Sequence, residues 1–467
     1  MKQMKYITFA LAAAVIGFSS CTKDLDLQPT DTFSEANAFL SMADIQLGAN
    51  EVYGRYGTYG NNLYASALIA DEAKLGADNS GQGALTYRYQ YASDNTSGGD
   101  VIGAWGGYYR VIDQCNRVIP KIPTVTATPA EEPRRNIIKG QLLAMRAISH
   151  FGLLESYCKK WNPSDNRGVP IMLASDPLAK PARNTQAQVM AQIESDLLEA
   201  KTLLPSVTSA TFTDTVMNRV NIAAYQARIA LYKGDYDNAV TYATEVISSG
   251  IRPLVSGAQF QAIWSDDVFD EVLFRIRYAT STAVGGLWTT TGGQVYIAPS
   301  DKLINAYSAN DVRLSTYIGT NGSGNKYVNK YFASSRGGRV VDLKCIRTAE
   351  MFLIRAEARA RKSSPDLAGA AADLNLLRSN RINGYVNETF GSATVLIDAI
   401  MQERFKELAF EGVRLFDLKR TGLPVQRLSS DASAAWQNLP ANDYRFVLPI
   451  PNTEMLANPN MVQNDGY

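Results

Sequence analysis

Histidine is almost absent from this chain of 467 residues, in which His150 is the single one. One histidine excludes the HExxH motif and zinc centres with three histidine ligands. A Ser–His–Asp triad is not excluded by this count, but the sequence contains no GxSxG motif. Because His150 lies in the middle of a helical pattern, we predict that it packs in the core or on a helix surface and takes no part in catalysis.

Cysteine is also scarce, and the four cysteines form no CxxC pair. Cys21 ends the N-terminal apolar region, which leaves Cys115, Cys158 and Cys345. Three widely spaced cysteines argue against a disulfide framework and against a thiolate zinc site. Cys115 and Cys158 fall within helical patterns, so we predict that they are small buried packing residues.

An excess of charge of one sign is missing as well. The chain has 46 Lys and Arg against 45 Asp and Glu, which gives a formal net charge of +1. This balance indicates neither a nucleic-acid partner nor an anionic membrane surface. We therefore predict no binding of nucleic acid.

Long hydrophobic runs are absent except near the N-terminus. Residues 6–18 form one apolar run after Lys2 and Lys5, and this run is too short to remain as a membrane-spanning helix. We predict a lipoprotein signal peptide over residues 1–20. Small residues precede Cys21, as in a lipobox, and Cys21 would become the acylated first residue. The alternative is an ordinary cleaved signal followed by an incidental cysteine.

Helical periodicity dominates the rest of the chain. Apolar residues recur at helical spacing in three long segments, residues 34–56, 131–157 and 185–204. Ser34 and Thr185 are the predicted N-cap residues of the first and third segments. Long amphipathic helices of this kind need partners to cover their apolar faces.

Two further segments read as pairs of helices. Residues 221–250 contain two helical patterns separated by a turn at Gly234, and residues 349–378 are a looser copy. Both resemble tetratricopeptide units. Because such pairs bury their apolar faces only by stacking, we predict a mainly α fold on a right-handed, tetratricopeptide-like helical-repeat scaffold.

Two loop-rich insertions interrupt this scaffold, near residues 76–104 and 255–345. Both are rich in Gly, Ser and Asn, and long polar loops that carry aromatic residues commonly bind ligands. The alternation at residues 272–278 predicts a strand, and Asn321-Gly322 predicts a hairpin turn. We therefore expect an irregular, partly β region that decorates the helices.

Aromatic residues in these loops are the main functional signal. The chain has 24 tyrosines, and several cluster in Gly- and Asn-rich loops. One face of a sugar ring carries C–H groups that stack on flat aromatic rings, while polar side chains take the hydroxyl rim. The predicted ligand-binding residues are Tyr87, Tyr89, Tyr91, Trp288, Tyr296 and Asp71. The alternative for each ring is that it only covers the scaffold.

Acidic residues leave some alternatives open. Asp71 and Glu72 are adjacent near the aromatic loops, and they could equally form a structural pair. A structural calcium ion bound by Asp78, Asp94 or Asp100 is an alternative that no twelve-residue loop pattern supports. Otherwise no cofactor is predicted. A glycosidase with two carboxylates needs no local motif, so the sequence does not exclude it.

The C-terminal stretch 397–422 has the strongest pattern. Interpreted as one helix, it carries an apolar stripe beside a line of charges spaced three or four residues apart. Half-buried charges need partners, so we predict an ion-pair clamp that holds the last helix on the repeats. Acid–base catalysis by paired carboxylates is the alternative. The predicted clamp residues are Arg404, Glu407, Glu411 and Arg414.

Residues 403–422 resemble the signature of the SusD/RagB-like lipoproteins, which are surface nutrient-binding proteins of Gram-negative bacteria. The resemblance extends to residues 25–30, to Trp105 with Tyr109, and to residues 448–467. It therefore covers the mature chain nearly from end to end.

The resemblance implies a lipid-anchored, non-enzymatic protein exposed at the surface of the outer membrane, with palmitate on the cysteine. Such a protein covers a TonB-dependent, SusC-like transporter and captures oligosaccharide, or peptide in some members. Residues 21–467 would form one SusD-like domain. Lys159-Lys160 departs from the family pattern, which often has a glycine turn there. A secreted glycoside hydrolase is the alternative function.

Overall fold

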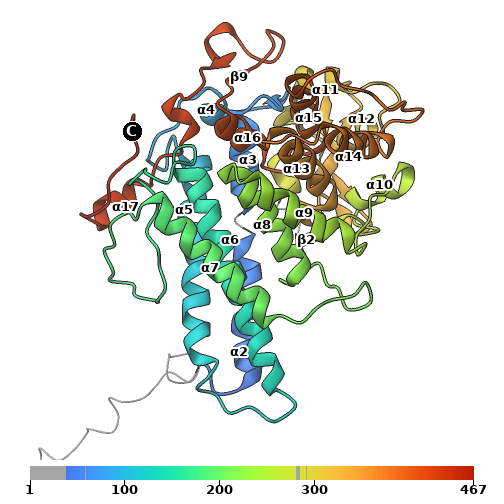
Figure 1. The fold of residues 1–467 in the computed structure, drawn as a ribbon. Helices are drawn as coiled ribbons and strands as arrows, with labels where there is room; N and C mark the ends of the chain where they lie inside the picture. The colour runs from blue at the N-terminus through green and yellow to red at the C-terminus, as the bar shows by residue number, and fades with distance from the viewer. Residues whose placement is uncertain (1–37, 58, 280–283, 291) are drawn as a thin grey trace, which may run out of the picture.

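The computed structural model describes residues 38–57, 59–279, 284–290 and 292–467, and within them the chain is mainly helical (Figure 1). The predicted mainly α fold is therefore confirmed. The helices are α2 (Met42–Tyr56), α3 (Tyr59–Ile69), α4 (Ala84–Tyr87), α5 (Gly99–Val118), α6 (Glu132–Tyr157), α7 (Gln186–Leu203), α8 (Arg219–Lys233), α9 (Tyr236–Ser248), α10 (Gly257–Trp264), α11 (Asp301–Ala306), α12 (Val312–Tyr317), α13 (Thr348–Arg361), α14 (Leu367–Ser379), α15 (Ala393–Glu407), α16 (Arg414–Thr421) and α17 (Asn452–Ala457).

Helices α2, α5, α6 and α7 lie side by side and extend from the lower part of the molecule (Figure 1). The predicted helix at 131–157 is confirmed by α6, and α7 follows the predicted N-cap Thr185. Helix α2 begins later than expected, because Ser41 caps its N-terminus with a reciprocal hydrogen bond to Asp44. The predicted cap Ser34 lies outside the described residues.

Helices α8 and α9 form a tight hairpin, and α13 and α14 form another that packs against α9. Gly234 ends α8 with φ of 77°, a left-handed conformation that glycine adopts without steric cost. Both predicted helix pairs are therefore present and stacked on one another, as a repeat scaffold requires.

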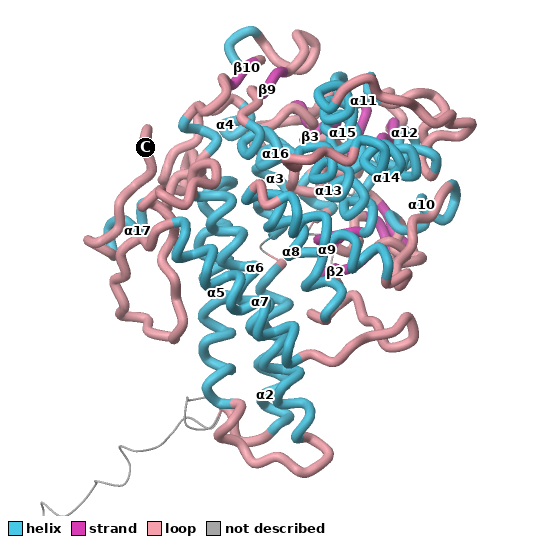
Figure 2. Tube along the Cα trace, in the orientation of Figure 1, coloured by secondary structure: helices cyan, strands magenta, loops and turns pink. Residues whose placement is uncertain are grey.

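The strands are short and lie mostly in the second insertion (Figure 2). The described residues form antiparallel two-stranded sheets. Their strands are β1 (Ala73–Leu75) with β3 (Ile297–Pro299), β2 (Val272–Ile276) with β8 (Leu343–Arg347), β4 (Ile318–Thr320) with β5 (Lys326–Val328), β6 (Ala333–Ser334) with β7 (Gly337–Gly338), and β9 (Val425–Gln426) with β10 (Asn438–Leu439). The predicted strand at 272–278 and the hairpin at Asn321-Gly322 are confirmed.

The prediction of one continuous helix over 397–422 is wrong. Helix α15 ends at Glu407 and α16 begins at Arg414. Between them, Phe410 and Gly412 both have positive φ, 62° and 78°, which no helix accommodates. A turn therefore separates the two halves and sends their charged side chains in different directions.

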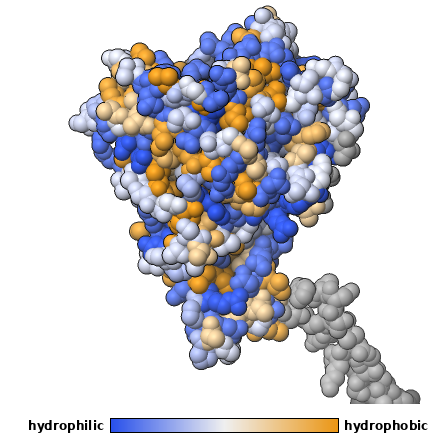
Figure 3. Space-filling view, turned by 90° about the vertical axis from the view of Figure 1, so that its right-hand side faces the viewer, coloured by the Kyte–Doolittle hydropathy of each residue, from blue (hydrophilic) through white to orange (hydrophobic). Residues whose placement is uncertain are grey.

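The core is one large cluster shared by the long helices, the repeats and the insertions, and a smaller cluster lies between α13, α14 and α15. On the face over the second insertion and the repeats, hydrophobic and hydrophilic residues are interspersed (Figure 3). Among the described residues, no helix combines the length and apolar character that crossing a bilayer requires.

Candidate functional site

Four of the five predicted sugar-binding rings are buried. Tyr87, Tyr89 and Tyr91 lie in the core, and Trp288 has 0% of its surface exposed. The expectation that these rings stand free in polar loops is wrong, because distant segments of the chain cover them. In this structure they present no open face on which a sugar could stack.

Tyr87 and Tyr89 enclose the side chain of Arg427. The guanidinium carbon lies 3.9 Å from the Tyr87 ring centre and 4.6 Å from that of Tyr89. The same guanidinium donates hydrogen bonds to the carbonyls of Leu68, Ile69 and Ala70 at 2.6–3.0 Å. These carbonyls end α3 and lack helical partners, so the two tyrosines support an arginine that caps α3.

Tyr91 begins a row of rings that leads to the surface. Its hydroxyl donates a hydrogen bond to the carbonyl of Arg445. Its ring stacks on Tyr467 with centres 6.3 Å apart, and the edge of Tyr467 meets Tyr444 at 5.2 Å. Tyr444 is 42% exposed, so the accessible ring of this row is one that the sequence interpretation did not select.

Trp288 packs against Tyr331 and Phe410, while the nearby Tyr296 is only half-buried. The backbone amide of Tyr296 donates to the carbonyl of Trp288 at 2.9 Å, which links the residue with the half-buried ring to the residue with the buried one. The Asn79 amide in turn donates to the carbonyl of Tyr296 at 2.9 Å. Tyr296 is thus the predicted ring that keeps accessible surface.

Asp71 is fully buried and carries two ion pairs. Its carboxylate accepts hydrogen bonds from Arg414 at 2.7 and 2.9 Å and from Lys302 at 2.7 Å. Burial by itself raises a carboxyl pKa, but the charges of Arg414 and Lys302 lower the pKa of Asp71 to about 2. Asp71 therefore joins α16 to the region after α3, and its predicted contact with a ligand is wrong for this structure because no part of it is accessible.

The neighbouring Glu72 is also fully buried, and neither carboxyl oxygen makes a hydrogen bond of good geometry. Burial, with the charge of Asp71 beside it, raises the pKa of Glu72 to about 8, although the nearby backbone of Phe410 favours the charged form. At neutral pH the protonated form of Glu72 thus predominates.

The aspartates considered for calcium are occupied by local hydrogen bonds. Asp94 accepts from the amides of Thr96 and Ser97, Asp100 accepts from the Thr86 hydroxyl, and one oxygen of Asp78 accepts from the Val295 amide. Within the described residues, no three His, Cys, Asp or Glu side chains converge in a geometry that could hold a metal ion.

The four predicted clamp residues all form ion pairs, but not with each other. Arg404 pairs with Asp417 at 2.7 Å, and Arg414 pairs with Asp71 at 2.7 Å. Because the turn after Glu407 breaks the helix, these side chains point to other elements instead of to one another along a helix face.

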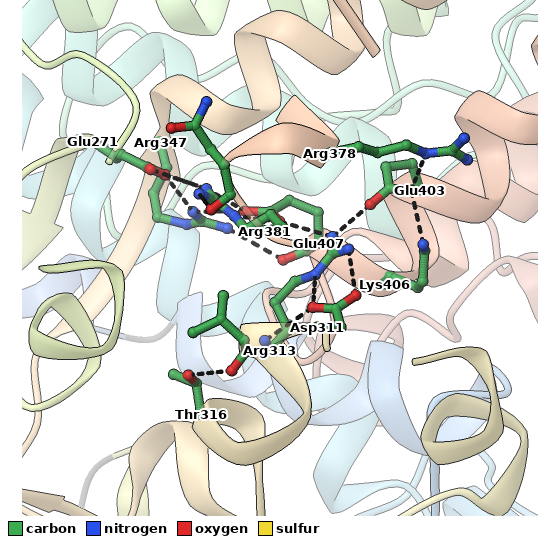
Figure 4. A network of polar contacts seen from close by, with 12 residues as sticks. Glu271, Asp311, Arg313, Thr316, Arg347, Arg378, Arg381, Glu403, Lys406 and Glu407 are labelled. Atoms are coloured by element: carbon green, nitrogen blue, oxygen red, sulfur yellow. Dashed lines mark hydrogen bonds and ion pairs between the residues drawn. The ribbon is translucent and has the colours of Figure 1, made fainter. Parts of the chain in front are cut away.

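Glu407 and Glu411 belong to a buried network that joins separate regions of the chain. Figure 4 shows Glu407 among its arginine partners. Glu407 pairs with Arg313 at 3.0 Å, with Arg347 at 3.1 Å and with Arg381 at 3.0 Å. The remaining carboxylates that pair with these arginines are Glu271, Asp311, Glu403 and Glu411. Every carboxylate in the network is buried, so this arrangement presents no acid–base pair to a substrate.

His150 is buried within α6 as predicted. Its Nδ1 lies 3.0 Å from the carbonyl of Arg146, and its Nε2 accepts a hydrogen bond from the Met172 amide. Burial lowers the pKa of His150 to about 3, so it is neutral at physiological pH.

Two family models match complementary parts of this chain. Residues 320–467 match the model described as the SusD family, and residues 25–231 match the model described as starch-binding associating with the outer membrane. Both models describe SusD-like families and together match residues 25–231 and 320–467, so this chain is similar to SusD-like proteins over most of its length. Members of the SusD-like family are carbohydrate-binding proteins.

Similar SusD-like proteins cover nearly the whole chain. SusD-like protein P2 of Formosa agariphila is 26% identical over 100% of both chains. A SusD superfamily protein from Bacteroides thetaiotaomicron is 27% identical, with a TM-score of 0.79 over 91% of this chain and 99% of its own. A laminarin binding SusD-like protein shares the fold at 19% identity, with a TM-score of 0.70 over 91% of this chain and 100% of its own.

In this SusD-like protein the sequence signature marks the scaffold and not an exposed site. The accessible aromatic residue Tyr444 was missed because it stands in a short C-terminal segment without periodicity. The pattern Asn442-Asp443-Tyr444, a turn signal followed by an aromatic residue, could have indicated it.

Proposed function

We propose that this SusD-like protein captures glycans at the cell surface and delivers them to a TonB-dependent, SusC-like transporter in the outer membrane. The observation that carries this proposal is the match of residues 25–231 to a family described as starch-binding and associated with the outer membrane. The region 21–467 would act as one SusD-like domain held at the membrane by acylated Cys21. No catalytic step is part of this proposal.

We propose the surface around Tyr296 as a glycan contact. Tyr296 is half-buried and is flanked by Asp78 and Asn79 of the first insertion. Asp78 is exposed and uses Oδ2 to accept the Val295 amide, while Oδ1 makes no hydrogen bond within the described residues. A partly open ring on a segment whose backbone binds an exposed carboxylate suits a sugar, which needs a stacking surface and an acceptor for a hydroxyl.

Tyr296→Ala is expected to weaken the binding of a neutral glucan oligosaccharide about ten-fold, which corresponds to about 1.4 kcal/mol. The reason is the loss of one stacking surface while the backbone hydrogen bonds of the loop are kept. Isothermal titration calorimetry on the full chain would measure the change. The matched control is Tyr236→Ala, which removes a half-buried tyrosine from α9 of the repeat scaffold and is expected to leave affinity unchanged.

Equal binding by the wild type and Tyr296→Ala would remove this surface from the proposal. Binding of peptides with no binding of any glycan would favour the peptide-binding alternative. Steady release of new reducing ends from a glycan would instead favour a hydrolase.

The proposed anchor has its own test. Cys21→Ala is expected to abolish the incorporation of palmitate and to move the protein out of the outer-membrane fraction, because no other residue could carry the lipobox acyl group. Labelled palmitate followed by membrane fractionation measures both effects. Cys115→Ala, a change in a buried cysteine, should retain the label. Palmitate on the Cys21→Ala protein would contradict the assignment. Cys21 itself lies outside the described residues.

A further inference from the structure

A hollow of about 300 Å³ lies where the end of α6, the end of α16 and the segment 442–447 meet. Its floor is apolar and includes the buried side chains of Phe446 and Val447. Leu423 and Tyr444 also line it and are each 42% exposed. A concave site with an apolar floor and accessible walls has the general form of a small-molecule site.

The Tyr444 ring is held in place before any ligand arrives. Gly466 has φ of 88°, and a Cβ atom on it would lie 2.3 Å from Cδ2 of Tyr444, so the backbone there packs directly against the ring. The Tyr467 ring, inclined at 73° with its centre 5.2 Å away, and the Arg445 guanidinium, 5.4 Å from the ring centre, also contact it. A rigid ring loses little conformational entropy when a ligand stacks on it.

The charged groups around the hollow are mostly basic. Lys159, Lys160 and Lys419 line it, against Asp443 alone among the acidic lining residues. Asp443 is already paired with Arg445 at 2.8 Å. The carboxylate of this hollow is thus neutralised within the protein.

The three lysines differ in their hydrogen-bond and ion-pair partners. Lys159 pairs with Asp465 at 2.7 Å, and Lys419 is buried and donates to the carbonyls of Glu155 and Cys158 at the end of α6. Lys160 is exposed and makes no hydrogen bond or ion pair within the described part of the chain. Its ammonium group is therefore available to an anionic ligand.

Asn442 completes the rim. It has a left-handed conformation with φ of 62°, it is exposed, and its side-chain amide makes no hydrogen bond within the described residues. A free amide both donates and accepts, which matches a sugar hydroxyl. Ring, amide and ammonium group thus border one hollow.

We infer that this hollow is a second saccharide subsite, selective for acidic sugars. The carboxylate or sulfate of the sugar pairs with Lys160, its C–H face stacks on Tyr444, and a hydroxyl contacts Asn442. The subsite rests on the proposed glycan-binding function, but it is distinct from the surface around Tyr296. It also gives a role to the Lys159-Lys160 departure from the family pattern.

The test uses the full chain and tetrasaccharides in matched pairs, measured by calorimetry. One pair is a uronic-acid tetrasaccharide and its carboxyl-reduced form, and the other is a sulfated tetrasaccharide and its desulfated form. The wild type is expected to bind at least one acidic member ten-fold or more tightly than its neutral partner, with a preference that shrinks as salt rises. The pair that shows the preference identifies the anionic group as carboxylate or sulfate.

Lys160→Gln is expected to remove this preference while keeping the affinity for the neutral member. Tyr444→Ala is expected to weaken both members of the pair. Lys180→Gln is the matched control, because Lys180 is an exposed lysine of the same connecting loop and forms no ion pair among the described residues. It should behave like the wild type.

The outcomes separate this inference from the proposed function. Binding of neutral glucans without any preference for acidic sugars would overturn the subsite and leave the proposed function standing. No binding of any saccharide would overturn both. An acidic preference that Lys160→Gln and Tyr444→Ala leave intact would show that the acidic sugar binds elsewhere.

Discussion

Replacing Glu407 with alanine is expected to lower the free energy of unfolding by roughly 3–5 kcal/mol. The carboxylate is fully buried and accepts contacts from three arginines, Arg313, Arg347 and Arg381, at 3.0–3.1 Å. Removing it leaves one unit of positive charge without compensation in a region that water does not reach. An unpaired buried charge costs far more than the pair contributes.

The remaining carboxylates cannot replace Glu407. Arg347 keeps Glu411 and Glu271, and Arg381 keeps only Glu271. Arg347 and Arg381 would then share Glu271, without the Glu407 carboxylate that now lies between them. Because they join β8 to the end of α14, strain at this point should loosen the insertion from the repeats.

Urea denaturation of the wild type and the variant measures the effect. Glu51→Ala is the matched control, since it breaks an exposed i,i+4 pair with Arg55 and should cost no more than about 1 kcal/mol. Glu411→Ala, which removes a carboxylate bound by Lys330 and Arg347, is expected to act like Glu407→Ala on stability and to spare glycan affinity in any folded fraction. A Glu407→Ala protein as stable as the Glu51→Ala control would contradict this account.

Local signals in the sequence were sufficient to predict where most of the helices lie. Thr185 caps α7 because its side chain accepts the Gln188 amide, a contact between residues three apart. Gly234 ends α8 because the turn needs a left-handed residue. Such features depend on neighbours along the chain, so a single sequence carries them.

The candidate site could not be predicted in the same way, because its accessibility depends on distant segments. Tyr87 and Tyr89 lie in a polar stretch of the sequence that was expected to be a loop, but Tyr87 ends α4, and Arg427, some 340 residues later, covers both rings. Helical periodicity likewise extended the predicted C-terminal helix beyond Glu407. The break occurs at Phe410, whose positive φ is set by packing and not by a glycine. The polar composition of a loop therefore does not establish that its aromatic residues are exposed.

The free energy of unfolding is expected to fall steeply as the pH drops below about 4. The charges of Arg414 and Lys302 outweigh burial and lower the pKa of Asp71 to about 2 from 3.8, and Arg404 and Arg420 do the same for Asp417. Arginine neighbours also lower the pKa values of Glu403 and Glu407 against the opposing effect of burial. A carboxyl group whose pKa is lowered in the folded state stabilises the fold at pH values above its pKa in the unfolded chain. That contribution is lost as the pH falls from about 4 to about 2.

The acidic groups with raised pKa values act in the opposite direction at higher pH. Burial raises the pKa of Glu72 to about 8 from 4.5. Between these values the folded state keeps a proton that the unfolded chain releases, so this group makes the fold less stable as pH rises from about 4.5 to about 8. Buried His150 acts against Glu72 between pH 4.5 and 6.5, because its pKa is lowered to about 3 and the unfolded chain takes up a proton that the folded state refuses. The steepest loss of stability should therefore lie on the acid side, below about pH 4, where several carboxylates titrate together.

Urea denaturation at pH 2 to 8 would test the predicted loss of stability at acid pH. The Asp417→Asn variant would show how much of that loss comes from Asp417. Asp417 accepts from Arg404 at 2.7 Å and from Arg420 at 2.8 Å, so the amide should cost roughly 2–3 kcal/mol at pH 7. At pH 2, which is close to the lowered pKa of Asp417, about half of the wild-type carboxyl groups are protonated, and the difference between the two proteins should shrink to a small fraction of its value at pH 7. Glu72→Gln should instead flatten the slope between pH 5 and 8. If wild-type stability were constant from pH 5 to 2, the buried carboxylates could not be ionised in the folded state, and the ion-pair network would have to be stabilised by shared protons instead of by charge.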